Sequence, residues 1–140
     1  MNHSVLLFHL VWRTRQHEPL ITIGVAQFLT RYLPAVAHQE KATVLAMGMV
    51  STHVHLLVRT DPTTGIPRLV QRFKGGSSRV AEIEGHAERL KWANGYSVTS
   101  VSRRDVPRLL QYLESQPVRH VNEAISDWPG YVSFIPADTL

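Results

Sequence analysis

Two histidines separated by a single residue, His53 and His55, form the part of the sequence best suited to chemistry. They open an apolar, β-branched run, residues 53–59, which is typical of a β-strand. Alternate side chains of a strand share a face, so both imidazoles point the same way, with Cβ atoms about 6–7 Å apart. Two imidazoles at this spacing can bind one divalent cation. The simpler alternative is a pair of half-exposed histidines without a ligand.

Tyr112 and Gln116 form a second candidate pair, because residues four apart share one face of a helix. Tyr112 is predicted to lie roughly 110° from the centre of the apolar stripe of that helix, so its phenol is free to face another surface. A tyrosine oxygen can attack phosphorus when a cation polarises the phosphate. The amide oxygen of Gln116 can complete a cation site begun by His53 and His55, and such a set suits Mg²⁺ or Mn²⁺. An ordinary boundary tyrosine is the alternative.

Basic side chains are concentrated in the first part of the chain. Fifteen Lys and Arg face eleven Asp and Glu overall; residues 1–79 hold nine basic and three acidic side chains, and residues 80–140 hold six and eight. A local positive excess favours a polyanion such as nucleic acid, although a merely solvated basic surface gives the same count. The candidate phosphate-binding residues are Arg72, Lys74, Ser77, Ser78, Arg79 and Arg13.

Length and composition exclude several classes of protein. A chain of 140 residues suits one domain, residues 1–140. The absence of cysteine excludes disulfide scaffolds, thiolate zinc sites and cysteine nucleophiles. No apolar run reaches the roughly 18 residues of a membrane helix, and the first residues do not form a signal peptide. We therefore expect a cytoplasmic protein without a membrane partner.

The elements that must position these residues follow the order β-α-β-β-α-β-α. We expect strands over residues 4–12, 43–50, 53–59 and 96–101, with a tight Ser51-Thr52 junction between the second and third. Helices are predicted over residues 20–38, interrupted or ended near Pro34, and over residues 66–74, loosened by Gly75-Gly76. A last helix begins at the N-cap Asp105 and ends before Pro117. Residues 80–95 carry no clear pattern, and residues 118–140 are expected to pack as a C-terminal tail.

This order predicts an α+β, ferredoxin-like (RRM-like) fold: an antiparallel sheet with helices on one face and an added C-terminal helix that bears the tyrosine. His9 lies within the first strand, where a satisfied core histidine is the expected role.

Five segments together resemble a known family, the single-tyrosine HUH (histidine, hydrophobe, histidine) transposases of small bacterial insertion sequences. Any one segment is weak, but five in the same order argue against coincidence, and the resemblance covers nearly the whole chain. The segments are HLVWRT at 9–14, HVHLLV at 53–58, FKGGSSR at 73–79, Trp92 with GYSVTSV at 95–101, and YLESQ at 112–116.

The resemblance implies a function and a role for each candidate residue. Tyr112 would attack a single-stranded DNA phosphodiester, giving a 5′-phosphotyrosine and a free 3′-OH. His53, His55 and Gln116 would hold the divalent cation, Mg²⁺ or Mn²⁺. The family also implies recognition of DNA hairpins and a homodimer in which the tyrosine helix of one subunit completes the metal site of the other.

Two features depart from the family pattern. The family usually has Asp or Asn, after a proline, before the first histidine; Ser51-Thr52 stands here, which predicts the loss of a contact that tunes the metal site. The chain also continues beyond Gln116, where residues 116–119 and 127–131 resemble the related transposases associated with repetitive extragenic palindromes. The alternative function is a domesticated, non-catalytic protein that binds hairpin or single-stranded DNA. A ferredoxin-like metal hydrolase acting on a small phosphate ester is a third hypothesis.

Overall fold

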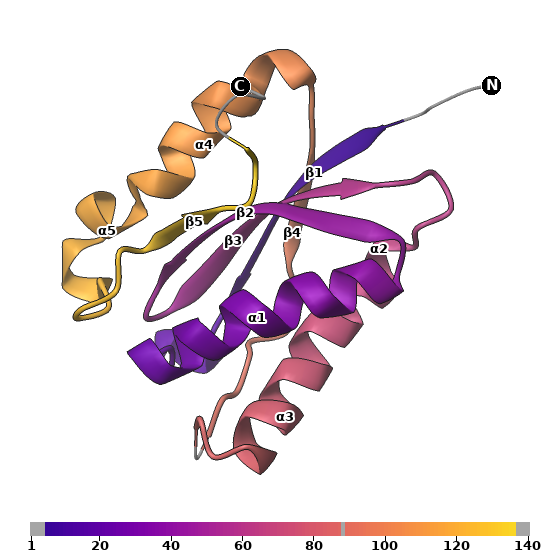
Figure 1. Cartoon of the computed structure of the whole chain (residues 1–140). Helices are drawn as coiled ribbons and strands as arrows, with labels where there is room; N and C mark the ends of the chain where they lie inside the picture. Colours follow the sequence, from indigo (N-terminus) through magenta and orange to yellow (C-terminus); the bar gives the residue numbers. More distant parts are fainter. Residues whose placement is uncertain (1–4, 88, 137–140) are drawn as a thin grey trace.

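A five-stranded antiparallel sheet, ordered β4-β1-β3-β2-β5, lies at the centre of the chain in a computed structural model that describes residues 5–87 and 89–136 (Figure 1). The first four strands in this order form the ferredoxin-like sheet predicted from the sequence, and the α+β fold is confirmed. Their bounds differ from the predicted ones by at most two residues. The strands are β1 (Leu6–Arg13), β2 (Ala42–Val50), β3 (His53–Thr60), β4 (Ser97–Val101) and β5 (Tyr131–Ser133).

Three helices, α1 (Ile23–Gln39), α2 (Ile66–Gln71) and α3 (Ser77–Ile83), cover one face of the sheet (Figure 1). Strand alternation turns the apolar side chains of β1 and β3 toward these helices and buries them in the main core. Trp12 of β1 stacks there on Phe73, with ring centroids 5.8 Å apart. No helix within the described residues has the length and apolar character needed to cross a bilayer.

The tyrosine-bearing helix α4 (Val106–Glu114) lies on the opposite face of the sheet (Figure 1). A second, smaller core fixes it there, formed by Leu7, Ala46, Leu57, Leu110 and Leu113. A Cβ atom at Gly48 of β2 would lie 2.8 Å from the carbonyl oxygen of Leu113, so glycine at this position permits the close approach of α4. These contacts therefore determine how closely α4 packs against the strands.

Helix α1 continues through Pro34, where the sequence predicts an interruption or an end. Its N-cap is Thr22, whose hydroxyl accepts a hydrogen bond from the amide of Val25. Proline costs the helix one backbone hydrogen bond. Burial of the neighbouring Leu33 and Val36 against the sheet outweighs this loss, so the prediction at Pro34 is wrong.

The glycine pair Gly75-Gly76 also does not end its helix. A π-helical turn, Arg72–Gly76, joins α2 directly to α3, so part of the segment without a clear sequence pattern is helical. A Cβ atom at Gly76 would collide with the hydroxyl of Tyr32 on α1. Glycine is needed here for close packing of two helices rather than for flexibility.

The chain after α4 is more ordered than a packed tail. A short helix, α5 (Gln116–Arg119), and a 3₁₀ turn, Val121–Glu123, lead into β5, which extends the sheet by pairing with β2. At the other end of α4, Asp105 occupies the predicted N-cap position without a side-chain cap bond, and accepts a hydrogen bond from the Ser102 hydroxyl instead. Residues 137–140 of the predicted tail lie outside the described residues.

Candidate functional site

The two histidines of β3 point toward the face that carries α4. His53 and His55 alternate with Val54, Leu56 and Val58, which are buried against the helices of the other face. This is the strand orientation predicted from the His-Val-His spacing. The site thus lies on the rigid centre of the sheet, because β3 pairs with both β1 and β2.

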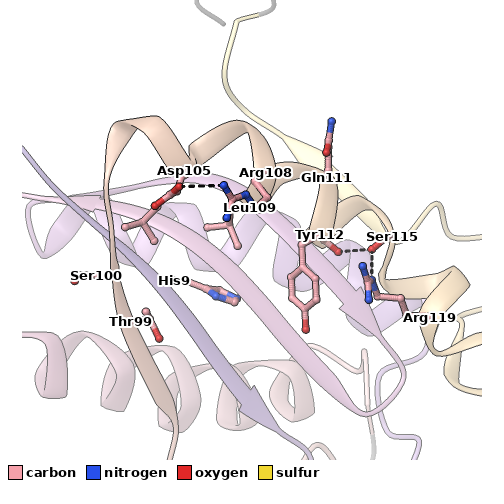
Figure 2. A pocket seen from close by; sticks show the side chains of 11 residues that line it. His9, Thr99, Ser100, Asp105, Arg108, Leu109, Gln111, Tyr112, Ser115 and Arg119 are labelled. Carbon is pink, nitrogen blue, oxygen red and sulfur yellow. Dashed lines mark hydrogen bonds and ion pairs between the residues drawn. The ribbon is translucent and has the colours of Figure 1, made fainter.

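Tyr112, on α4, extends its side chain toward His55. Figure 2 shows its side chain pointing from the helix toward the sheet, with His9 of β1 projecting into the same space. The ring of Tyr112 stands edge-on to His55 at a centroid distance of 5.5 Å, and edge-on to His9 at 6.2 Å. The phenol thus contacts the same sheet against which Leu110 and Leu113 of the apolar stripe are buried, and not a separate surface.

Gln116 reaches the site from the first position of α5, just beyond the end of α4. Its amide nitrogen donates a hydrogen bond to the carbonyl oxygen of Tyr112 at 3.3 Å. The amide oxygen consequently faces the Nε2 atom of His53, 3.1 Å away. The side chain is fully buried, so this orientation is fixed by its surroundings.

One chain therefore brings together all four residues predicted for catalysis and metal binding: His53, His55, Tyr112 and Gln116. Two imidazoles and an amide oxygen fit a divalent cation that takes its other ligands from water and substrate. No group of three or more His, Asp or Glu side chains forms a metal site anywhere in residues 5–87 and 89–136. The donor set fits an open site that leaves room for a phosphate.

His9 belongs to this site and not to the core, contrary to the role expected from the sequence. Its Nε2 atom lies 2.9 Å from Nδ1 of His55, and the two rings stack with centroids 5.1 Å apart. A metal-binding imidazole needs a partner for its second nitrogen. His9 supplies that partner to His55, across the β1–β3 pairing that no local sequence pattern reveals.

Burial keeps the imidazoles of the site neutral. It lowers the pKa of His55 to about 3, with smaller contributions from the neighbouring His53 and His9, whose charged forms would repel a charged His55. Burial is also the main cause that lowers the pKa of His53 and that of His9. Only neutral imidazole offers the lone pair that binds a cation.

These shifts predict that the protein loses stability in mild acid. Between pH 6.5 and about 3, His55 is protonated in the unfolded chain but not in the folded one. The free energy of unfolding should therefore decrease as the pH falls below 6.5, by up to about 1.4 kcal/mol per pH unit for this residue, with no contribution above pH 6.5. Urea unfolding of wild type and His55→Gln between pH 5 and 8 measures the effect. Equal slopes below pH 6.5 in the two proteins would contradict it.

Two cavities meet at Tyr112. The first, here called the histidine groove, has a volume of about 490 Å³ and is lined by Arg13, His53 and His55 among others. The α4–β4 cavity, about 760 Å³, contains Arg119 and lies between the tyrosine helix and the edge strand (Figure 2). His9 and Tyr112 line both, so the phenol forms part of the wall between them. Both volumes are in the range of ligand-binding pockets.

Two arginines, Arg13 and Arg119, lie beside this site, and a third, Arg108, lines the α4–β4 cavity 3.8 Å from Asp105. Arg13 ends β1, directly opposite His53 in the strand register, and lines the histidine groove. The guanidinium of Arg119 lies 5.1 Å from the ring centre of Tyr112 and donates to the Ser115 hydroxyl at 2.8 Å. Arg13 was among the sequence candidates; Arg119 was not, because its closeness to Tyr112 depends on the turn between α4 and α5.

The other DNA-binding candidates lie in the π-helical turn and in α3, on the opposite face of the sheet. Arg72 pairs with Glu40 at 2.8 Å, and Lys74 donates to two backbone carbonyls in the segment before β4. Ser77 is fully buried and accepts a hydrogen bond from the Trp92 indole, so direct phosphate binding by its hydroxyl is incompatible with this structure.

Ser78 and Arg79 complete this candidate set. The Ser78 hydroxyl donates to the carbonyl of Gly75, and Arg79 is exposed on α3. DNA contacts by Ser78, Arg79, Arg72 and Lys74 stay predictions. The structure does not bring these residues beside Tyr112.

Comparison with known proteins identifies the family and supports the fold. Residues 2–116 match the profile of the family described as "Transposase IS200 like". The ISDra2 transposase TnpA of Deinococcus radiodurans is 29% identical over 117 residues, which cover 79% of this chain and 84% of that protein. The crystal structure of a proposed transposase from Deinococcus radiodurans R1 has a TM-score of 0.65 at 26% identity, over 89% of this chain and 95% of that one.

A second solved structure has lower sequence identity and supports the fold alone. It is a REP-associated tyrosine transposase bound to a REP hairpin, with a TM-score of 0.68 at 16% identity, over 94% of this chain and 82% of that one. The family profile extends from the first strand to Gln116 and so includes both histidines and Tyr112. On this match, which spans most of the sequence, the chain belongs to the IS200-like transposase family.

Proposed function

We propose that the chain cleaves and rejoins single-stranded DNA through a covalent bond to Tyr112, with a divalent cation, Mg²⁺ or Mn²⁺, held by His53, His55 and Gln116. The observation that carries the proposal is the convergence of these four side chains within one chain, on the face of the sheet that α4 covers. The fit of the donor set, two neutral imidazoles and an oriented amide oxygen, supports the metal.

The proposed reaction is a transesterification. The Tyr112 oxygen attacks the phosphorus of a phosphodiester; a bond from that oxygen to phosphorus forms and the bond from phosphorus to O3′ breaks. The phenolic proton passes to solvent, and the departing O3′ takes up a proton to become a 3′-OH. The tyrosine then carries the 5′ phosphate, and attack by another 3′-OH reverses the exchange and rejoins DNA without ATP. When bound, the cation polarises the phosphate and offsets its negative charge.

The two cavities on either side of Tyr112 give the DNA strand a path across the site. A strand that passes from the histidine groove to the α4–β4 cavity would present a phosphate at the phenol. We assign the flanking phosphates to Arg13 on one side and to Arg119 on the other, because Arg108 of the same cavity is paired with Asp105. The fold neighbour bound to a REP hairpin supports hairpin DNA as the substrate class.

We further propose that the site works within one chain. The family resemblance implies a homodimer whose tyrosine helices are exchanged between subunits. Here Tyr112 and Gln116 already lie against His55 and His53 of the same chain, so a second copy is not needed to complete the site. A homodimer stays a prediction, and a site completed in trans is the alternative to this proposal.

A covalent adduct tests the proposed function. Incubation with a 5′-labelled single-stranded hairpin oligonucleotide and with its 3′-labelled counterpart, both with Mn²⁺, should give an SDS-resistant protein–DNA band only with the 3′ label. EDTA should abolish that band. A band with the 5′ label would reverse the polarity of the proposed bond. Salt-dependent DNA binding without any adduct would instead support the non-catalytic DNA-binding alternative.

A further inference from the structure

A buried threonine connects the metal site to the C-terminal segment. Thr52 lies in the tight junction between β2 and β3 and is only 3% exposed. Its hydroxyl oxygen lies 3.1 Å from Nδ1 of His53 and 2.6 Å from Oε1 of Glu123. Glu123 belongs to the 3₁₀ turn after α5, seventy-one positions along the chain from Thr52.

The chemistry of these three groups determines the direction of both hydrogen bonds. A carboxylate can only accept, and a hydroxyl has one hydrogen to donate. The Thr52 hydroxyl therefore donates to Glu123, and its lone pair accepts the Nδ1–H of His53. A neutral imidazole carries one ring hydrogen, so Nε2 of His53 is left with a lone pair.

That lone pair points into the site. Nε2 of His53 faces the amide oxygen of Gln116 at 3.1 Å, and this oxygen is itself an acceptor. Two acceptor atoms at this distance repel each other unless a proton or a cation interacts with both of their lone pairs. The threonine bond thus leaves the arrangement of His53 and Gln116 suited to a shared cation.

Glu123 is held firmly enough to act as the anchor. Its backbone carbonyl accepts a hydrogen bond from the amide of Ser51 at 2.7 Å, and its second carboxylate oxygen lies 3.2 Å from Nδ1 of His120. The His120 ring stands edge-on to His53, with centroids 5.0 Å apart. Backbone and side chain of the turn after α5 therefore both contact the β2–β3 junction.

We propose that Thr52 and Glu123 are positioning residues, which lock His53 in its Nδ1–H form and so present Nε2 to the divalent cation. This inference rests on the proposed metal-dependent function and deepens it. The family resemblance predicts a lost contact at the Ser51-Thr52 junction, but here Thr52 itself contacts His53 and the chain after Gln116 supplies the carboxylate that accepts from its hydroxyl. Loss of a hydrogen-bond partner behind a metal-binding histidine typically weakens metal affinity about 10–100-fold.

Direct metal binding tests the proposal without DNA. Free Mn²⁺, measured by electron paramagnetic resonance during titration of the full chain, gives the Kd of each variant. Thr52→Val should raise the Kd for Mn²⁺ about 10–100-fold, whereas Thr52→Ser, which keeps the hydroxyl, should remain close to wild type. Glu123→Ala frees the hydroxyl to donate to His53, and should also raise the Kd. Thr60→Val, a buried threonine at the far end of β3, is the matched control and should bind Mn²⁺ like wild type.

The position of the ring hydrogen of His53 is a second quantity to measure. A merely structural role of Thr52 would not determine it. In metal-free wild type, the ¹⁵N spectrum of the imidazole should show a protonated Nδ1 and an unprotonated Nε2; in Thr52→Ser the pattern should persist. A protonated Nε2 in wild type would overturn the proposal, even if Thr52→Val does not fold. So would Mn²⁺ affinity in a folded Thr52→Val equal to that of wild type. Absence of a DNA adduct in wild type with normal Mn²⁺ binding would instead contradict the proposed function alone.

Discussion

Replacement of Tyr112 by phenylalanine is expected to abolish the covalent protein–DNA adduct completely. Phenylalanine keeps the ring that stands edge-on to His55 and His9, and removes only the oxygen that would bond to phosphorus. The fold and the DNA contacts should therefore survive while the reaction stops. The adduct on a denaturing gel, with a 3′-labelled hairpin oligonucleotide and Mn²⁺, measures the chemistry, and a filter-binding titration measures DNA affinity.

Tyr131→Phe is the matched control for this substitution. Tyr131 begins β5 and packs against the smaller core beside α4, so it lies on the same side of the sheet as Tyr112. This variant should form the adduct at the wild-type level. An adduct that persists in Tyr112→Phe, or that disappears in Tyr131→Phe, would show that the nucleophile is a different residue.

The sequence alone was sufficient to predict four of the five strands and the orientation of the two histidines on β3. The alternation around His53 and His55 is a local property of one strand, and burial of Val54 and Leu56 on the other side enforces it. The pair Tyr112 and Gln116 was also predictable, because their spacing keeps them together even though a helix boundary falls between them. Features that depend only on strand alternation or helix spacing can therefore be predicted from a single sequence.

The contacts behind the proposed metal site were not predictable, because they join residues far apart in the chain. His9 meets His55 across forty-six positions, through the pairing of β1 with β3. Thr52 meets Glu123 across seventy-one, through a turn that follows α5. In sequence, His9 reads as a core residue and Thr52 as a departure from the family. Only the tertiary structure shows that each partners one of the two histidines.

The DNA contacts predicted for Arg72 and Lys74 stay predictions, but the structure gives both side chains partners within the chain. The positive charge of Arg72 is compensated by Glu40 of the neighbouring α1–β2 connection, and Lys74 holds the segment before β4. Both roles stabilise the fold. Net charge along a stretch of sequence does not reveal which face of a sheet a helix will cover, and here that face is opposite Tyr112.

His53→Ala should separate the metal-dependent step from DNA binding. Its imidazole supplies one of three proposed ligands. Without it the cation binds weakly, and the transition state, in which charge develops on the phosphate, loses several kcal/mol of stabilisation. Adduct formation at low Mn²⁺ should therefore fall at least about 100-fold. DNA affinity should change little, because Arg13 and Arg119, the cations proposed to bind the flanking phosphates, are retained. Quantified adduct yield and filter binding, on the same protein preparation, measure the two effects.

Raising the Mn²⁺ concentration distinguishes a lost ligand from a lost fold. If His53 acts only by holding the cation, mass action should partly restore the adduct in His53→Ala at high Mn²⁺. Tyr112→Phe should show no such recovery, because the metal cannot replace the missing oxygen. His38→Ala, at the exposed end of α1 on the other face, should match wild type at every concentration. Full adduct formation by His53→Ala at low Mn²⁺ would remove His53 from the metal site, and the positioning role of Thr52 and Glu123 with it.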